Sequence, residues 1–201
     1  MYLVIGGAGR TGRRVADLLA ADGREVIIAS RRPRGGRTVD LSRSLDPGLL
    51  NGVDGVVVSV EPPADTAGAE AVMHHGVANI ATLASRAGIP VVLISQIYIT
   101  RADQHPEIAG IIRARAAGEQ ALRDSGATYT VIRPAWLTND PPTGVRLEQG
   151  DKGDGTASRE TVAQAAVAAL LHPDAAGQTF ELYDSDTPPD WPVLFAGLRA
   201  D

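Results

Sequence analysis

The feature that most constrains the fold is a glycine-rich stretch near the start of the chain, Gly6-Gly-Ala-Gly-Arg-Thr-Gly12. A short apolar run, Tyr2-Leu-Val-Ile5, precedes it, and the residues that follow carry apolar side chains at helical spacing. The order strand, glycine turn, helix is typical of dinucleotide-binding folds. In that order Gly6 permits a sharp turn, Gly9 lets a pyrophosphate approach the backbone, and Gly12 allows close packing of helix and strand.

The spacing of the three glycines, G-x-x-G-x-x-G, differs from the G-x-G-x-x-G of the commonest dehydrogenases. A tight turn without a ligand is therefore the alternative interpretation. The free N–H groups and partial positive charge at the start of the following helix favour a phosphate instead. We expect this segment, with Arg10 and Thr11, to bind the cofactor's phosphates.

The second apolar run, residues 25–30, ends in Arg31-Arg32-Pro33-Arg34. An acidic residue at this place binds the ribose of NAD, whereas arginine accommodates the 2′-phosphate of NADP. Arg31 is the main candidate for that contact, Arg32 supports it, and Arg10 is a second donor. The sequence predicts NADP(H) as the cofactor, with a solvated basic loop as the alternative.

Apolar runs and helical patterns alternate along the chain, which predicts an α/β protein. We expect a single-domain Rossmann fold over residues 1–201, a doubly wound parallel sheet with helices on both faces. The expected strands are 2–5, 25–30, 38–41, 54–60, 89–95, 128–134 and 178–183, with a small extra strand at 145–148. The expected helices are 13–22, 69–87, 107–124, 159–171 (with Ser158 as N-cap) and 191–198.

Ligands bind such sheets at the carboxyl ends of the strands. Those ends are predicted at Asp40, Leu41, Ser59, Val60, Ser95 and Pro134, which we expect to contact the cofactor. The irregular segments 61–68, 96–106 and 135–157 would form the substrate pocket, with Trp136 and Pro141-Pro142 lining or covering it.

Composition excludes several classes of function. The 201 residues carry a formal net charge of −5 and no cysteine, so neither nucleic-acid binding nor a cysteine-ligated metal is expected. We expect no membrane span and no signal peptide, and hence a cytoplasmic protein.

His74 and His75 are adjacent on a predicted helix and would point about 100° apart, so no metal site is expected there. Few aromatic residues and no apolar surface stripe favour a monomer slightly over a homodimer.

The chain resembles the atypical short-chain dehydrogenase/reductases with an NAD(P)-binding, NmrA-like domain. The resemblance rests on the glycine turn, Arg31, Asp40-Leu41, Asp54-Gly-Val-Val, Ser95, Leu122-Arg-Asp-Ser-Gly126, Tyr129-Thr-Val-Ile-Arg-Pro134, Thr143-Gly144 and the helix 159–171. It covers nearly the whole chain. Within the family, the small biliverdin-IXβ reductases and flavin reductases look most similar.

The chain departs from the family in its catalytic residues. Typical members use a Tyr-x-x-x-Lys pair, in which tyrosine donates a proton and lysine lowers its pKa. The single lysine here is Lys152, and Glu148 stands four residues before it. Aligned on the Ser-Gly motif, the two catalytic positions hold Ile111 and Arg115. Reduction of a flavin, quinone or linear tetrapyrrole is less demanding, because such an acceptor delocalises charge and can take its proton from water.

The resemblance implies that Ser95 lies beside the nicotinamide and orients the acceptor; a hydroxyl capping the strand is the alternative. Tyr98 could serve as proton donor, and Arg115 could hold a ribose or phosphate, although a salt bridge from Arg115 to Glu119 is slightly favoured. Arg133 would shape the turn beside the nicotinamide. The predicted function is NADPH-dependent hydride transfer to a flavin-like or other conjugated small acceptor. A non-catalytic redox sensor and a non-redox enzyme remain alternatives.

Overall fold

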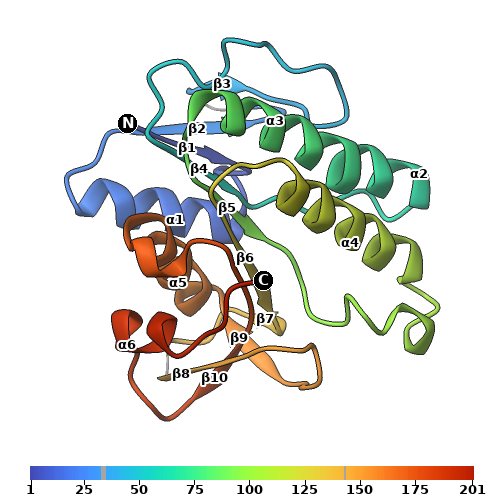
Figure 1. Ribbon diagram of the computed structural model, residues 1–201, viewed down its shortest axis with the longest axis vertical. Coiled ribbons are helices and arrows are strands. Elements are labelled where there is room, and N and C mark those ends of the chain that lie inside the picture. Colours follow the sequence, from blue (N-terminus) through green and yellow to red (C-terminus); the bar gives the residue numbers. More distant parts are fainter. Residues whose placement is uncertain (33–34, 143) are drawn as a thin grey trace.

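The computed structural model describes residues 1–32, 35–142 and 144–201, and it confirms the predicted Rossmann-type α/β fold. An eight-stranded sheet has the order β3-β2-β1-β4-β5-β6-β10-β8, and helices cover both of its faces (Figure 1). Neighbouring strands are parallel except β10 and β8, which pair antiparallel. Pro33, Arg34 and Thr143, which the sequence assigned to the basic loop and to the family resemblance, lie outside the described residues.

The strands are β1 (Tyr2–Ile5), β2 (Val26–Ser30), β3 (Arg37–Thr38), β4 (Gly55–Val58), β5 (Val91–Ile94), β6 (Tyr129–Pro134), β7 (Trp136–Thr138), β8 (Gly144–Glu148), β9 (Thr156–Ser158) and β10 (Gln178–Ser185). The helices are α1 (Arg10–Ala21), α2 (Thr66–Ala69), the π-helix η1 (Glu70–Gly76), α3 (Val77–Ala87), α4 (Ala109–Asp124), α5 (Arg159–Leu171) and α6 (Trp191–Ala196). Short 3-10 turns lie at Ala102–Gln104 and Pro173–Ala175.

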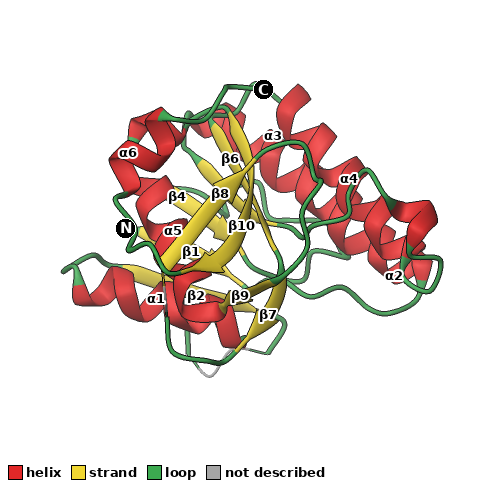
Figure 2. Ribbon diagram, turned by 90° about the horizontal axis from the view of Figure 1, so that it is seen from below, coloured by secondary structure: helices red, strands yellow, loops and turns green. Residues whose placement is uncertain are grey.

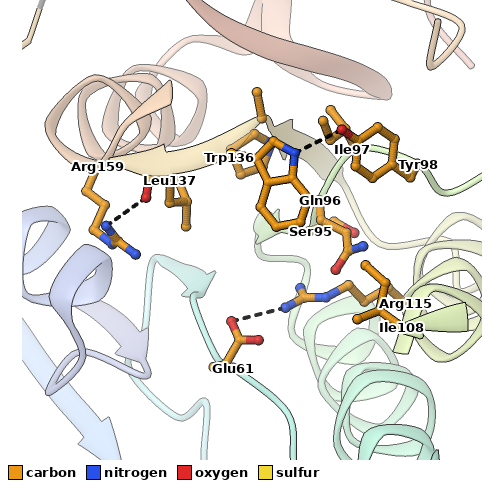
Figure 3. Close-up of a pocket in the computed structure, with 12 residues that line it drawn as sticks. Glu61, Ser95, Gln96, Ile97, Tyr98, Ile108, Arg115, Trp136, Leu137 and Arg159 are labelled. Carbon is orange, nitrogen blue, oxygen red and sulfur yellow. Dashed lines mark hydrogen bonds and ion pairs between the residues drawn. The ribbon is translucent and has the colours of Figure 1, made fainter. Parts of the chain in front are cut away.

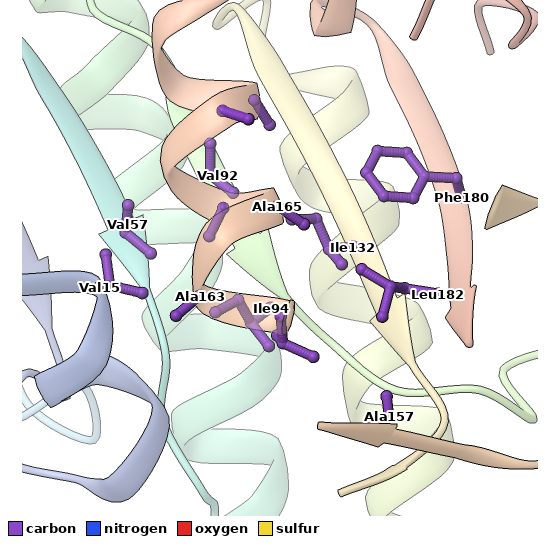
Figure 4. Close-up of a cluster of buried hydrophobic side chains, with 14 of the residues drawn as sticks. Val15, Val57, Val92, Ile94, Ile132, Ala157, Ala163, Ala165, Phe180 and Leu182 are labelled. Atoms are coloured by element: carbon purple, nitrogen blue, oxygen red, sulfur yellow. The ribbon is translucent and has the colours of Figure 1, made fainter. Parts of the chain in front are cut away.

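The two faces of the sheet have separate cores, because side chains alternate along each strand. Val4 of β1 and Val57 of β4 point to the core shared with α1, α5 and α6 (Figure 4). Their neighbours Leu3, Val56 and others point to the opposite core, which η1, α3 and α4 cover. Figure 2 shows these two groups of helices on opposite sides of the sheet.

Helix α5 has the bounds that the sequence predicts, and Ser158 is its N-cap, accepting a hydrogen bond from the Glu160 amide at 3.3 Å. Its alanines are buried almost all round, since the helix packs against α1 on one side and the sheet on the other. A helix that is apolar on every side is stable only when it is enclosed in this way.

The predicted helix 69–87 is wrong in its first half. It begins at Thr66, inside the predicted loop, and the seven residues of η1 form π-helix, in which each N–H bonds five residues back. The wide turn lies where α4 comes closest: a Cβ on Gly118 would stand 1.8 Å from the Met73 carbonyl oxygen. This conformation accompanies tertiary packing that periodicity does not reveal.

Two smaller predictions are also corrected. The third strand covers only Arg37–Thr38, so Val39, Asp40 and Leu41 leave the sheet as a loop. The segment 135–157 contains β7, which pairs in parallel with β9 in a separate two-stranded sheet. Strands of three residues carry too little pattern to be recognised in a sequence.

The strand order reverses between β1 and β4, because β2 and β3 lie on one side of β1 whereas β4, β5 and β6 lie on the other. A crevice therefore opens beyond the carboxyl ends of these two strands, with α1 on one side and α2–α3 on the other. In the described part of the chain, no helix combines the length and apolar character that a bilayer crossing requires.

Candidate cofactor and acceptor site

The glycine turn has the geometry that its residues suggest. Gly6 has φ of +84°, and a Cβ there would lie 1.9 Å from the Ser59 carbonyl oxygen, so no other residue fits. A Cβ on Gly12 would lie 2.4 Å from the Gly6 carbonyl oxygen, which shows how closely α1 packs against the turn. Gly9 is the N-cap of α1, and the nearest atom to its absent Cβ is the Gly6 oxygen at 3.1 Å. The backbone at Gly9 thus faces open space at a helix N-terminus.

Cavities follow the carboxyl edge of the sheet from this turn in both directions. The first has a volume of about 230 Å³ and lies between β2 and β4. It is lined by Gly6, Gly9, Ser30, Arg31, Asp40, Leu41, Ser59 and Val60, among others. Arg31 and Arg32 are exposed at its rim and also line a neighbouring hollow with Asp40. The structure therefore brings together the residues predicted for the adenosine half of the cofactor.

Asp40 is held in place by its own loop. Its carboxylate accepts hydrogen bonds from the Ser42 amide at 3.0 Å and the Ser42 hydroxyl at 2.7 Å. These bonds lower the pKa of Asp40, and the charges of Arg43 and Arg31 act in the same direction. The Asp40 carboxylate is thus a fixed negative group beside Arg31, which leaves the arginine as the group able to receive a phosphate.

Two further cavities meet at Ser95. The central one, about 210 Å³, is lined by Gly9, Arg10 and Thr11 of the turn and by residues at the ends of β4 and β5. The outer one, about 230 Å³, lies between the segments that follow β5 and β6, with Pro134 and Trp136 in its wall. Both cavities are lined by Glu61, Ser95, Arg115, Leu137 and Arg159. We call the outer one the acceptor cavity.

The Ser95 side chain is only 5% exposed, and its Oγ has no hydrogen-bond partner in the described part of the chain. A buried hydroxyl without a partner is unfavourable by roughly 1–3 kcal/mol. The strand-capping alternative would give the hydroxyl a backbone partner, and the structure shows none among the described residues. Ser95 lines both cavities, so its unpartnered hydroxyl lies beside the place where they meet.

Arg115 reaches the same junction from α4 and is only 4% exposed. The expected salt bridge to Glu119 is wrong, because Arg115 pairs instead with Glu61 at 3.6 Å, as Figure 3 shows. Its Nε has no partner among the described residues, and Nη1 makes a long contact of 3.5 Å with the Ile94 carbonyl oxygen. Burial lowers the pKa of Arg115. A cation this poorly paired is suited to a ligand with hydroxyl or phosphate oxygens.

Tyr98 stands in the acceptor cavity, but its hydroxyl is already engaged. The hydroxyl donates to Asp154 at 2.6 Å. It also accepts from Trp136 Nε1 at 2.9 Å, a bond that Figure 3 shows. Burial and the bond to Asp154 raise the pKa of Tyr98. The backbone at Tyr98 has φ of +74°, which is uncommon for a bulky residue. A proton-donor role for Tyr98 stays a prediction and would require Asp154 to release the hydroxyl.

Arg133 has a different position from the one predicted. It is a residue of β6, and its guanidinium donates to Glu119 at 2.6 Å and to Glu181 at 3.0 Å; both acids are almost fully buried. The amide of buried Asp151 donates to Glu181 at 3.0 Å. Arg133 therefore belongs to a buried ion-pair network, while the adjacent Pro134 lines the acceptor cavity.

The network continues to the wall of the acceptor cavity through Asp151. One oxygen of this carboxylate accepts from the Tyr98 amide at 2.7 Å, and the other from the Thr100 amide at 2.8 Å. Asp151 thereby holds the unusual backbone at Tyr98 against the body of the protein. Neither Asp151 nor Glu181 was predicted from the sequence, because a loop aspartate and a strand glutamate normally face solvent.

Arg159 was not predicted as a cavity residue from the sequence, and neither was Ile108, which also lines the acceptor cavity. Arg159 is the first residue of α5, and its Nη1 donates to the carbonyl oxygens of Leu137 at 3.1 Å and Thr138 at 3.0 Å. An arginine directly after an N-cap is common on surfaces, so its residue type carried no signal. Of the residues predicted to line or cover the pocket, Trp136 is in the cavity wall, whereas the exposed Pro141-Pro142 turn is not among its lining residues.

The two helix histidines do not diverge as predicted, because they lie in η1. Their rings stack with centroids 4.4 Å apart, and a nitrogen of each lies 4.0 Å from a carboxylate oxygen of Glu70. The three side chains could approach one ion. One nitrogen of each histidine lies 4.0 Å from the same oxygen, Glu70 Oε1, so the prediction that the two side chains point apart is wrong.

The glycine turn before an open helix N-terminus and the reversal of strand order are features of an NAD(P)-binding Rossmann protein. The family of NAD(P)H-binding proteins matches residues 6–173, and the chain belongs to this family. This result confirms the family predicted from the glycine turn.

Among curated relatives, (4-alkanoyl-5-oxo-2,5-dihydrofuran-3-yl)methyl phosphate reductase of Streptomyces griseus is 30% identical over 200 residues, covering 90% of this chain and 66% of the relative. The chain spans 32% and 35% of the length of two other curated relatives, each 37% identical over a shorter segment.

Solved structures with the same fold include a candidate NAD-dependent epimerase/dehydratase of Bacillus halodurans, with a TM-score of 0.84, 22% identity and coverage of 93% of this chain and 95% of that one. Another is the anaerobillin reductase ChuY of Escherichia coli O157:H7, with a TM-score of 0.74, 19% identity and coverage of 94% and 98%. At these identities the similarity shows the fold alone.

Proposed function

We propose that the protein is an NADPH-dependent oxidoreductase that transfers hydride to a flavin-like or other conjugated small acceptor without a Tyr/Lys pair. The observation that carries the proposal is the Ser95 hydroxyl, buried and without a partner where the central and acceptor cavities meet. The reductases among the relatives and neighbours support a redox reaction by their names.

The residues present fit a bound dinucleotide. Open backbone at Gly9 and the start of α1 would hold the pyrophosphate, with Arg10 and Thr11 beside it. Arg31, with Arg32 in support, would bind the 2′-phosphate as a guanidinium fork. Asp40, Leu41, Ser59 and Val60 would surround the adenosine half. When bound, the reduced nicotinamide supplies the hydride.

On the acceptor side the chain contributes position rather than acid catalysis. Ser95 would donate its free hydroxyl hydrogen to a polar atom of the acceptor and fix its angle to the cofactor. Arg115 would hold a ribose or phosphate oxygen at the same junction. Ile111, at the usual tyrosine position, packs against the core of η1, α3 and α4, so it supplies no proton. The chemistry therefore suits an acceptor that takes its proton from water.

The test is the loss of reduced-nicotinamide absorbance when the protein meets NADPH and FMN, riboflavin, biliverdin or simple quinones. Turnover with at least one acceptor, slowed by Ser95→Ala, supports the proposal. Tight NADPH binding with no turnover of any acceptor would refute the reductase and favour a sensor or a non-redox enzyme on the same fold.

A further inference from the structure

Arg159 lies at the junction of the two cavities with part of its guanidinium unused. Nη1 is taken by the carbonyl oxygens of Leu137 and Thr138 and by Asn139 Oδ1 at 3.2 Å. Nε and Nη2 have no protein partner among the residues that the structure describes. In Figure 3 the guanidinium extends from α5 toward the space between Leu137 and Glu61. The anchor on β7 thus fixes one edge of the fork and leaves the other for a ligand.

The surroundings of Arg159 have more positive than negative charge. Burial lowers the pKa of Arg159, the charges of Arg10 and Arg14 act in the same direction, and the charge of Glu61 opposes them. Glu61 is itself paired with Arg115, and Arg14 pairs with Glu160 at 3.4 Å. Four arginines therefore share two carboxylates. The phosphates at the start of α1 would meet Arg10, and Arg159 would remain free for a second anion.

The wall of the acceptor cavity combines apolar side chains with the polar groups of Glu61, Gln96 and Arg115. Ile97, Ile108, Ala135 and Leu137 line the cavity, and Trp136 is oriented by its hydrogen bond to Tyr98. An aromatic ring held in this way offers a planar body a surface to stack on. The cavity thus combines an apolar wall, a free hydroxyl at Ser95 and an incompletely used guanidinium.

We propose that the acceptor is a planar, conjugated molecule carrying a phosphate or carboxylate group, and that Arg159 binds this anionic group. The proposal rests on the proposed function and adds the substrate class. A charge-assisted bond from a fixed guanidinium is expected to raise affinity for the anionic member of a matched pair on the order of tenfold or more. Arg159 is a specificity residue here and takes no part in hydride transfer.

The test uses ligand pairs that differ only by a phosphate, measured by calorimetric titration of the NADP⁺-loaded protein: FMN against riboflavin, and naphthyl phosphate against naphthol. The wild type should bind the phosphorylated member on the order of tenfold or more tightly in at least one pair. Arg159→Gln should abolish this preference and leave the affinities for riboflavin and NADP⁺ unchanged. Arg159→Lys should restore part of it.

Arg14→Gln is the matched control, since it removes one positive charge near Arg159 from a residue that lines neither cavity. It should leave the phosphate preference intact. Absence of a preference in both pairs would overturn the proposal. An Arg159→Gln variant that keeps the preference and loses NADP⁺ affinity instead would also overturn it, because the arginine would then bind the cofactor. A preference that depends on Arg159, found in a protein that reduces none of the acceptors, would uphold anion binding and refute the reductase.

Discussion

Two glycines of the turn should separate cofactor binding from folding. At Gly9 the backbone has φ of −81° and ψ of 172°, which any residue adopts, and the nearest atom to a new Cβ is 3.1 Å away. Gly9→Val should therefore change the free energy of unfolding by no more than about 1 kcal/mol. At Gly12 a Cβ would lie 2.4 Å from a backbone oxygen. Gly12→Val should force α1 away from the turn and destabilise the fold by about 1–3 kcal/mol or more.

For NADPH binding we expect the opposite of the effect on stability: Gly9→Val, which changes stability little, should weaken binding strongly. A side chain on Gly9 fills the space in front of the α1 N-terminus, where N–H groups would bind phosphate oxygens. Each such charge-assisted bond contributes about 1.5–3 kcal/mol, so loss of two corresponds to roughly a hundredfold weaker binding or more. The stabilisation that saturating NADPH gives the wild type, about 2.7 kcal/mol at a hundred times Kd, should disappear in Gly9→Val.

The assay is urea unfolding with and without NADPH, together with calorimetric titration of NADPH into each folded variant. The decisive result is a Gly9→Val protein with a normal urea midpoint and no NADPH-dependent shift. A Gly9→Val protein that is equally stable and binds NADPH with wild-type affinity would show that the glycine turn holds no nucleotide. A Gly12→Val protein as stable as the wild type would contradict the close packing of α1 against the turn.

Four further substitutions test individual contacts. Arg31→Ala should weaken NADPH binding far more than NADH binding in titrations, and equal losses would remove Arg31 from the 2′-phosphate site. Ser95→Ala should lower kcat/KM roughly tenfold while NADPH affinity stays unchanged, and the urea midpoint should not fall, because the substitution removes a buried hydroxyl that has no protein partner in the described part of the chain. Unchanged turnover would make Ser95 structural. Glu119→Gln should destabilise the fold by about 3–5 kcal/mol by breaking the buried pair with Arg133, which a near-normal urea midpoint would contradict. Burial raises the pKa of Tyr183 to about 12. Between about pH 10 and 12 the folded state therefore keeps a proton that the unfolded state loses, so the free energy of unfolding falls as the pH rises. Tyr183→Phe should reduce that fall.

The fold could be predicted because its signals are local. The continuous apolar runs of β1 and β4 and the glycine turn between strand and helix depend on neighbouring residues. Ser158 followed by an alanine-rich run gave α5 with its correct bounds. The π-helix η1 could not be predicted in this way, since it occurs where Gly118 of a distant helix meets the Met73 carbonyl.

The residues of the candidate site likewise include some that local signals could place and some that they could not. Residues at strand ends, such as Ser59 and Ser95, could be placed because parallel strands align their carboxyl ends at one edge. Long side chains could not be placed, because the partner of an arginine depends on the tertiary fold. Arg115 has the helical spacing for a bond to Glu119, yet it reaches the cleft and Glu61, while Glu119 binds Arg133.

The buried charges explain how an irregular segment can form a fixed wall for a ligand. Tyr98 has a strained backbone and lies in the irregular segment after β5, and such segments are normally mobile. Asp151 binds the Tyr98 and Thr100 amides, its own amide binds Glu181, and Glu181 binds Arg133 in the centre of the sheet. Each of these carboxylates is shielded from water, so its bonds are stronger than surface bonds and costly to leave unmade. The acceptor cavity therefore takes its rigidity from an ion-pair network anchored in β6 and β10. The proposed hydride transfer by positioning would require such rigidity, because the predicted alignment assigns the usual tyrosine and lysine positions to Ile111 and Arg115.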